Sequence, residues 1–283
     1  MRIGFHIPIR FGLSRVAELA DERGCSTVQV FTRAPQNWRI NKLENREVAA
    51  FRDGMAARDI APVFVHTQYL LSLGTHEAGL RERSVRSLLL DLNRAALLGA
   101  PYVVTHIGSA AQANRSTAVR RVSRAVDAAM ANAAECVMLL LENSAAAGSL
   151  LGGSPAELAD VICGSAFPDR LGVCMDTSHA FAAGHSITTA TGLDDFLGEM
   201  DRCFGLERLR LIHLNDSKAP FGSRVDRHWH IGRGEMGEAA LARILNHPRL
   251  RDLPFIMETP GFDLRTDRMN MRAVRRLCRG APE

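Results

Sequence analysis

LGVCMDTSH, residues 171–179, decides the fold class of this chain. Its first six residues form a short, continuous apolar run that ends in an acid, Asp176. Strands with continuous rather than alternating apolar residues are typical of a parallel sheet that is covered on both faces. His179 follows three residues after the acid, so the segment joins a predicted buried strand to two side chains of metal-binding type.

Runs of the same kind recur along all 283 residues, and helical patterns lie between them at 13–24, 118–135 and 154–162. Eight strands that alternate with helices predict a (β/α)8 TIM barrel, and an open α/β sheet is the alternative. No linker-like stretch interrupts the chain, so we expect a single domain over residues 1–283. The other predicted strands are 2–6, 27–31, 62–66, 102–106, 137–142, 209–214 and 254–258.

The composition is that of an ordinary globular protein, with 46% hydrophobic and 23% charged residues. The 35 basic and 31 acidic residues give a net charge of +4, which permits an anionic partner without requiring one. Nearly all the bases are arginines, since only Lys42 and Lys218 are lysines. Arginine suits phosphate because its planar group donates two parallel hydrogen bonds, although a codon bias explains the same usage.

The cysteines and the N-terminal residues bear on the cellular compartment. The six cysteines are scattered without a CxxC pair, which argues against a thiolate zinc site and for a reducing compartment. The first residues, MRIGFHIPIRFG, carry no signal-peptide pattern. No stretch reaches the roughly 18 uncharged apolar residues of a membrane helix. We therefore expect a cytoplasmic protein with no membrane partner.

Histidines and carboxylates stand at the ends of six successive predicted strands. In a TIM barrel the C-terminal ends of the strands form the active-site mouth, so these side chains are expected to face one another there. A single histidine at a strand end is more often structural, but six such residues in succession are improbable by chance. They are His66, His106, Glu142, Asp176, His213 and Glu258.

The loops add three further candidates, namely His179 and the pair Asp226 and His228 from the loop 214–237. An extended i, i+2 pair points both side chains to the same side of the chain. Nine candidate ligands are too many for one zinc ion, which takes about four, and with one shared carboxylate they fit three ions. Zinc is the expected metal, and the same donors also suit manganese or iron.

The loop 214–237 also carries groups that suit phosphate. Its glycines allow close backbone approach to a ligand, and its bases are Lys218, Arg224, Arg227 and Arg233. Because paired metal ions are suited to hydrolysing a phosphodiester, the pattern points to a metal-dependent phosphodiesterase. The alternative for the four bases is a set of solvated loop charges.

Six segments match the motifs of one family: VHTQYLLSLG (65–74), VVTHIGS (103–109), LLLENSAAAGSLLG (139–152), LGVCMDTSHAFAAG (171–184), HLNDSKAPFGSRVDRHWHIGRGEMG (213–237) and PFIMETP (254–260). Over about its whole length the chain resembles the endonuclease IV family of apurinic/apyrimidinic (AP) endonucleases. The resemblance implies a TIM barrel with three zinc ions. It also implies an enzyme of base excision repair that cuts double-stranded DNA 5′ to an abasic site, leaves a 3′-hydroxyl and trims blocked 3′ ends.

The resemblance also divides the nine ligands among the three metals, with Glu142 as the bridge between the first two. Because they would hold these two metals, the carboxylates Glu142, Asp176 and Glu258 are also the predicted catalytic residues. The three sets are His66, His106 and Glu142 for the first metal, Glu142, Asp176, His213 and Glu258 for the second, and His179, Asp226 and His228 for the third.

Contacts with DNA follow from the same resemblance. Tyr69 matches a family tyrosine near the lesion, and residues 31–38 match a loop that reaches into the duplex. In that loop Gln36 stands where many members have arginine, and SAAAG (144–148) replaces a run that often contains glutamine. These departures bear on the strength of DNA binding and on lesion preference. The expected DNA-binding residues are Gln36, Asn37, Tyr69, Lys218, Arg224, Arg227 and Arg233.

Two other functions fit parts of the pattern. A metal-dependent sugar or sugar-phosphate isomerase or epimerase on the same barrel would need only one or two metals and fewer ligands. A non-catalytic protein that binds abasic DNA would keep the barrel and lose turnover. His6 ends the first strand and matches no ligand, so it either supports the ligands or packs in the core. We expect a monomer, because a duplex-binding barrel can act alone.

Overall fold

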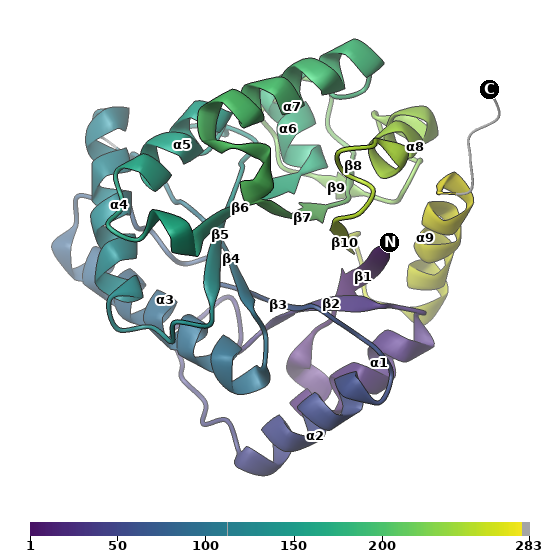
Figure 1. Cartoon of the computed structure of the whole chain (residues 1–283), viewed down its shortest axis with the longest axis horizontal. Helices are drawn as coiled ribbons and strands as arrows, with labels where there is room; N and C mark the ends of the chain where they lie inside the picture. Colours follow the sequence, from purple (N-terminus) through teal and green to yellow (C-terminus); the bar gives the residue numbers. More distant parts are fainter. Residues whose placement is uncertain (112, 279–283) are drawn as a thin grey trace.

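Eight parallel strands close into a barrel in the computed structural model, which describes residues 1–111 and 113–278. Around the barrel the order is β1-β10-β7-β6-β5-β4-β3-β2, so the first strand closes onto the last (Figure 1). The predicted TIM barrel is confirmed, and the open-sheet alternative is wrong. The barrel strands are β1 (Arg2–His6), β2 (Thr27–Phe31), β3 (Val63–His66), β4 (Tyr102–His106), β5 (Met138–Glu142), β6 (Leu171–Asp176), β7 (Leu209–His213) and β10 (Pro254–Met257).

Helices surround the barrel and cover its outer face (Figure 1). The helix predicted over 118–135 begins earlier, where the Asn114 side chain accepts a hydrogen bond from the Ser116 N–H, and ends at Met130 before the chain turns back into β5. The α-helices are α1 (Val16–Glu22), α2 (Asn45–Ala56), α3 (Ala78–Leu98), α4 (Arg115–Met130), α5 (Pro155–Cys163), α6 (Thr177–Ala183), α7 (Ala190–Phe204), α8 (Gly237–Asn246) and α9 (Leu264–Leu277). Short 3-10 helices are η1 (Ile9–Phe11), η2 (Leu13–Arg15), η3 (Pro168–Arg170) and η4 (Leu206–Arg208).

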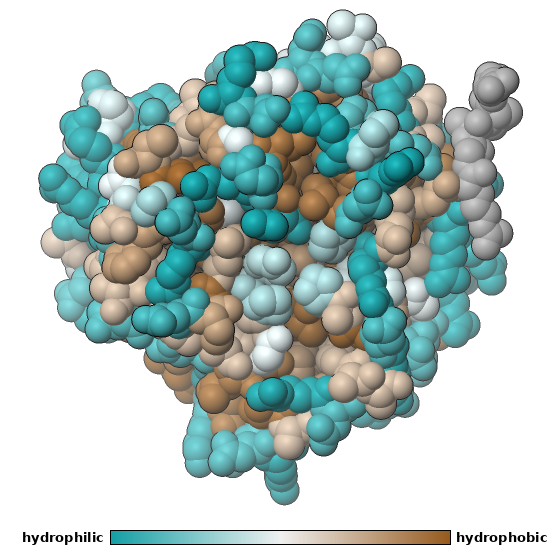
Figure 2. All heavy atoms as spheres, viewed as in Figure 1, coloured by the Kyte–Doolittle hydropathy of each residue, from teal (hydrophilic) through white to brown (hydrophobic). Residues whose placement is uncertain are grey.

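The face of the molecule that Figure 2 shows carries both hydrophilic and apolar side chains. In Figure 2 hydrophilic side chains dominate the edge of the face in view, and apolar side chains show mainly in the hollows between them. Among the described residues, no helix combines the length and the apolar character that a membrane crossing requires.

The two faces of each barrel strand enter different cores, because successive side chains of a strand point in opposite directions. Outward residues such as Val65 and Leu139 join the large core between the sheet and the helices. The inward residues form a separate buried cluster, Phe64, Val104, Leu140, Cys174, Leu211 and Ile256. The next inward position after each of these six is a predicted ligand, so the fold places the ligands in one layer above an apolar plug.

The plug should contribute strongly to stability. Leu140 is fully buried within it, so Leu140→Ala is expected to lower the free energy of unfolding by about 3 kcal/mol through lost burial and the cavity left behind. Urea unfolding followed by circular dichroism measures this change. Leu97→Ala is the matched control, because Leu97 is 56% exposed on α3. Equal losses in the two variants would contradict a well-packed plug.

A small second sheet orders the loop 214–237. β8 (Asp216–Ser217) pairs with β9 (His228–Trp229) in antiparallel fashion, with Ser217 opposite His228. The buried Asp216 carboxylate accepts hydrogen bonds from the N–H groups of Gly234 at 2.9 Å and Met236 at 3.1 Å. The loop is thereby fixed at both ends of the segment that carries Asp226 and His228.

Candidate metal centre

The buried carboxylate of Glu142 lies at the centre of the predicted ligands. Its Oε2 atom is 3.0 Å from Nε2 of His66 and 3.6 Å from Nε2 of His106. Its Oε1 atom is 3.1 Å from Nδ1 of His213 and 3.3 Å from Nδ1 of His179. Ligand atoms from His66, His106 and Glu142 lie within 4.8 Å of one another, which is the spacing a metal site requires. The structure therefore brings together the set predicted for the first metal.

A second group of donor atoms shares Glu142 with the first. It consists of Glu142, Asp176, His213 and Glu258, whose ligand atoms again all lie within 4.8 Å. His213 is fully buried and its Nδ1 atom lies 3.3 Å from Oε2 of Glu258 and 3.9 Å from Oδ2 of Asp176. One carboxylate thus faces two groups, as a bridging ligand must.

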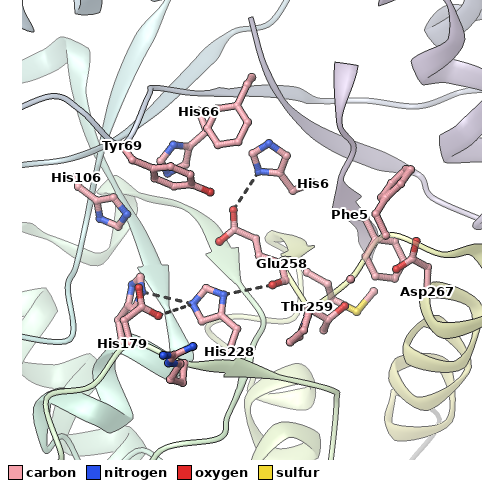
Figure 3. A pocket seen from close by; sticks show the side chains of 17 residues that line it. Phe5, His6, His66, Tyr69, His106, His179, His228, Glu258, Thr259 and Asp267 are labelled. Carbon is pink, nitrogen blue, oxygen red and sulfur yellow. Dashed lines mark hydrogen bonds and ion pairs between the residues drawn. The ribbon is translucent and has the colours of Figure 1, made fainter. Parts of the chain in front are cut away.

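The third group comes from α6, β9 and the loop before β9. Nε2 of His179 lies 3.2 Å from Oδ2 of Asp226, and Nε2 of His228 lies 3.4 Å from Oδ1 of Asp226. The same nitrogen of His228 is 3.4 Å from Oδ2 of Asp176, and Asp176, His179 and His228 also form a group within 4.8 Å. Figure 3 shows these histidines and Glu258 turned toward the same space. All nine predicted ligands therefore meet at one mouth.

In four of the histidines, one ring nitrogen lies within hydrogen-bond distance of an oxygen atom; we call it the outer nitrogen. His66 Nδ1–H donates to the Thr67 carbonyl at 2.7 Å, and His179 Nδ1 lies 3.0 Å from the Asn143 carbonyl. His228 Nδ1 lies 3.3 Å from the Glu258 carbonyl, and His213 Nε2 lies 2.9 Å from Oε1 of Gln29. When a metal is bound, such partners fix which nitrogen carries the proton and direct the lone pair of the other nitrogen toward the centre. This donor chemistry fits divalent cations.

Three supporting residues escaped the sequence analysis. Asn215 donates to Oδ2 of Asp176 at 2.7 Å and accepts from the Glu258 N–H at 2.8 Å. Asn143 accepts from the Asp176 N–H at 2.6 Å. Gln29 donates to Oε1 of Glu258 at 2.7 Å while it binds the outer nitrogen of His213. A polar residue inside the apolar run TVQVF was the available signal for Gln29.

Loss of the Gln29 amide should loosen the second group of ligands. Gln29→Leu keeps the approximate size of the side chain but removes its hydrogen bonds to His213 and Glu258, so metal affinity should fall about 10- to 100-fold. Titration against a competing zinc chelator measures this change. An unaltered affinity would mean that the barrel core alone orients these two ligands.

His6 supports the ligands rather than the apolar core. Its Nδ1 atom lies 3.1 Å from Oε1 of Glu258, and 3.0 Å from Nε2 of Gln29. Its ring also packs 4.2 Å from the ring of Phe31, measured between centroids. Of the two roles left open by the sequence, the contacts favour positioning of Glu258.

Opposite charges within the cluster stabilise the charged forms of its side chains, which burial alone would disfavour. Burial disfavours the charge on Glu142, but the neighbouring histidines, His106 and His213 foremost, outweigh it and hold the pKa of this carboxyl well below its usual value. Burial also disfavours a charge on His179, yet Asp176 and Asp226 help to raise its pKa well above the usual value. The Glu142 carboxylate is therefore ionised at neutral pH, and a cation that binds His179 must displace a proton.

The predicted DNA-binding residues are all exposed, but they occupy different places. Arg227 and Tyr69 line the mouth cavity, which has a volume of about 470 Å³ and contains most of the ligands. Gln36 lines a neighbouring cavity of about 650 Å³, beside Arg10. Nζ of Lys218 lies 4.2 Å from the centre of the Trp229 ring. Like Lys218, the other three line neither cavity in the described part of the chain; they are Asn37, Arg224 and Arg233.

Comparisons with known proteins agree with this geometry. A family model described as a xylose isomerase-like TIM barrel matches residues 17–279. The chain is 41% identical to a probable endonuclease 4 of Methanoculleus marisnigri, over 98% of each chain. The crystal structure of endonuclease IV from Thermus thermophilus is 38% identical with a TM-score of 0.88, covering 99% of this chain and 100% of that one.

Sugar epimerases share the fold at much lower identity. The crystal structure of a D-tagatose 3-epimerase-like protein matches with a TM-score of 0.75 and 15% identity, over 99% of this chain and 97% of that chain. Identity at this level supports the barrel and nothing beyond it. Because the close relatives share about two residues in five over nearly their whole length, the chain belongs to the endonuclease IV family.

Proposed function

We propose that this AP endonuclease hydrolyses the DNA phosphodiester on the 5′ side of an abasic site, leaves a 3′-hydroxyl, and also trims blocked 3′ ends. The observation that carries the proposal is the arrangement of three donor groups around one mouth, with Glu142 common to two of them. Epimerization needs fewer metal ligands than these groups provide. Membership of the endonuclease IV family supports DNA as the substrate.

We propose three zinc ions per chain, held by the nine residues in the sets given above, with manganese or iron as alternatives at one or more positions. When bound, the ions would neutralise phosphate charge and make water a better nucleophile. The ligands would offset part of the charge of the ions, because four of the nine are carboxylates. Divalent ions that bridge carboxylates reduce their mutual repulsion.

The remaining roles belong to side chains of the chain itself. Arg227 is exposed at the mouth and would donate hydrogen bonds to a phosphate that lies against the ligands. Tyr69, 61% exposed at the edge of the same cavity, would pack against the sugar at the lesion. Lys218, Arg224 and Arg233 would hold the flanking backbone, and Gln36 and Asn37 would reach the duplex. We place this activity in the cytoplasm and in a monomer.

A labelled duplex with one abasic-site analogue tests the proposal. The zinc-loaded protein should cut on the 5′ side of the analogue, and the new 3′ end should be a substrate for a polymerase, because it carries a free hydroxyl. A duplex without the analogue is the control. Tight binding without cleavage by fully loaded protein would contradict the proposal and favour a binding protein. Metal content near one ion per chain would favour the epimerase alternative.

A further inference from the structure

A second cavity adjoins the mouth on the side of β1 and β2. Its volume is about 650 Å³, and it shares His6, Phe31, Gly261 and Phe262 with the mouth cavity. Pockets for small organic groups have volumes of about 300–1,000 Å³ and combine apolar walls with a few polar groups. We call this space, which the segments after β1, β2 and β10 enclose, the side cavity.

Aromatic rings that are fixed by their neighbours form the walls of the side cavity. The Phe31 ring lies 4.2 Å from the His6 ring and meets the Tyr69 ring edge-on at 5.4 Å, between centroids. The Phe262 ring lies 4.1 Å from the guanidinium carbon of Arg23, which is itself buried and paired with Asp267 at 2.7 Å. These walls suit a planar, weakly polar ligand.

Hydrogen-bonding groups without partners stand at the rim of the side cavity. Among the described residues, the side chains of Arg10, Gln36 and Asn41 make no hydrogen bond or ion pair. The guanidinium carbon of Arg10 lies 4.8 Å from the centre of the Phe11 ring and 5.4 Å from that of the Phe262 ring. No acidic side chain is among the described residues that line the cavity. The rim therefore offers free donors to a ligand with acceptor atoms, and it does not repel a phosphate.

A buried ion pair and its hydrogen bonds hold the cavity in shape before any ligand arrives. Nη2 of Arg33 lies 3.0 Å from Oδ2 of Asp91, and both side chains are buried. Thr32 Oγ1 donates to Oδ1 of the same Asp91 at 2.6 Å, and Arg94 donates to the Thr32 carbonyl at 2.9 Å. The segment after β2 is thus attached to α3. A preformed site avoids the entropic cost of ordering a loop on binding.

We propose that the side cavity is a subsite for a purine base, belonging to a nucleotide next to the phosphodiester that is cut. Guanidinium and carboxamide groups pair with purine edges, because arginine bonds O6 and N7 of guanine and glutamine bonds N6 and N7 of adenine. Arg10 and Gln36 supply these groups, and Phe31 and Phe262 supply the apolar walls. The inference rests on the proposed function, since it places the phosphate at the metal ligands in the adjoining mouth.

Direct binding tests the subsite without any cleavage. Deoxyguanosine 5′-monophosphate and 2-deoxyribose 5-phosphate carry the same phosphate and sugar, but only the first has a base. Calorimetry on the zinc-loaded protein should give an affinity for the nucleotide at least about tenfold higher, because one good pairing of base and side chain contributes about 1–3 kcal/mol. Equal affinities would overturn the proposal.

Two exposed residues allow a test that does not disturb folding. Gln36→Ala should lower the affinity for deoxyadenosine 5′-monophosphate about tenfold and leave the affinity for the sugar phosphate within about twofold, since glutamine pairs with the N6 and N7 edge of adenine. Arg10→Ala should lower the affinity for deoxyguanosine 5′-monophosphate to a similar extent, because arginine pairs with O6 and N7 of guanine. An equal loss for this nucleotide and for the sugar phosphate would overturn the contact of Arg10 with the base. Ile40→Ala is the control, because Ile40 is 64% exposed on the same segment and lies outside the side cavity. A matching loss in this variant would overturn the assignment to the cavity.

Cleavage separates the subsite from the proposed function. Abasic duplexes with purines beside the lesion should have a lower KM than duplexes with pyrimidines there, and Gln36→Ala should remove the difference. An enzyme that cuts both duplexes with equal KM would overturn the subsite alone. A loaded enzyme that cuts neither would overturn the proposed function, while the binding comparison would still decide the subsite.

Discussion

Glu142→Gln should lower the rate of abasic-site incision roughly 10³-fold or more while the barrel stays folded. Removal of one stabilising group from an enclosed active site usually costs 10²–10³ in rate, and here two donor groups lose the same negative charge. The new amide would also donate hydrogen bonds to the histidine nitrogens, whose lone pairs must be free to bind a metal. Single-turnover cleavage of a labelled abasic duplex measures the chemical step.

The control for this substitution lies just before the same strand. Glu135 is exposed and precedes β5 at the end opposite to Glu142, so Glu135→Gln makes the same chemical change far from the mouth. It should cut DNA at the normal rate. Metal content and urea unfolding of both variants distinguish a lost ligand from a lost fold. Near-normal turnover of Glu142→Gln with a full complement of metal would show that the bridge is wrongly assigned.

The barrel was predictable because both faces of its strands are buried. Burial on both sides makes every strand a continuous apolar run, and such runs appear in the sequence without any knowledge of pairing. Strand ends were less certain, since Glu258 was predicted within a strand that ends at Met257. The small sheet of β8 and β9 could not be predicted, because strands of two residues show no periodicity.

The ligands were more predictable than the residues that support them. Six of the nine candidate ligands occupy the inward position at or just after the end of a barrel strand, so their place follows from the strand end, as for His66 and Glu142. Gln29 lies in the middle of β2, and only the three-dimensional arrangement brings it to His213. The predicted DNA contacts involve exposed side chains such as Arg224, whose positions depend on the bound partner, so these assignments stay predictions.

Removal of the metals should abolish incision and also lower the melting temperature. An ion that binds only the folded chain stabilises it by about 2.7 kcal/mol at a free concentration of one hundred times its Kd. For a chain of this size, that amount corresponds to a shift of about 4–5 °C. Thermal unfolding with and without a chelator measures the shift, and added zinc should restore both the stability and the incision.

Metal removal should abolish incision, but it should lower the melting temperature without unfolding the protein. In the metal-free protein the inner nitrogens of His66 and His213 already face the Glu142 carboxylate, so the mouth should take up protons and stay folded rather than collapse. Glu142→Gln should therefore show a smaller shift with zinc than the unaltered protein, because it retains fewer anionic ligands. A chelated protein that still cuts abasic DNA would contradict metal-dependent hydrolysis. A chelated protein that neither cuts nor loses stability would mean that the ions bind without coupling to the fold.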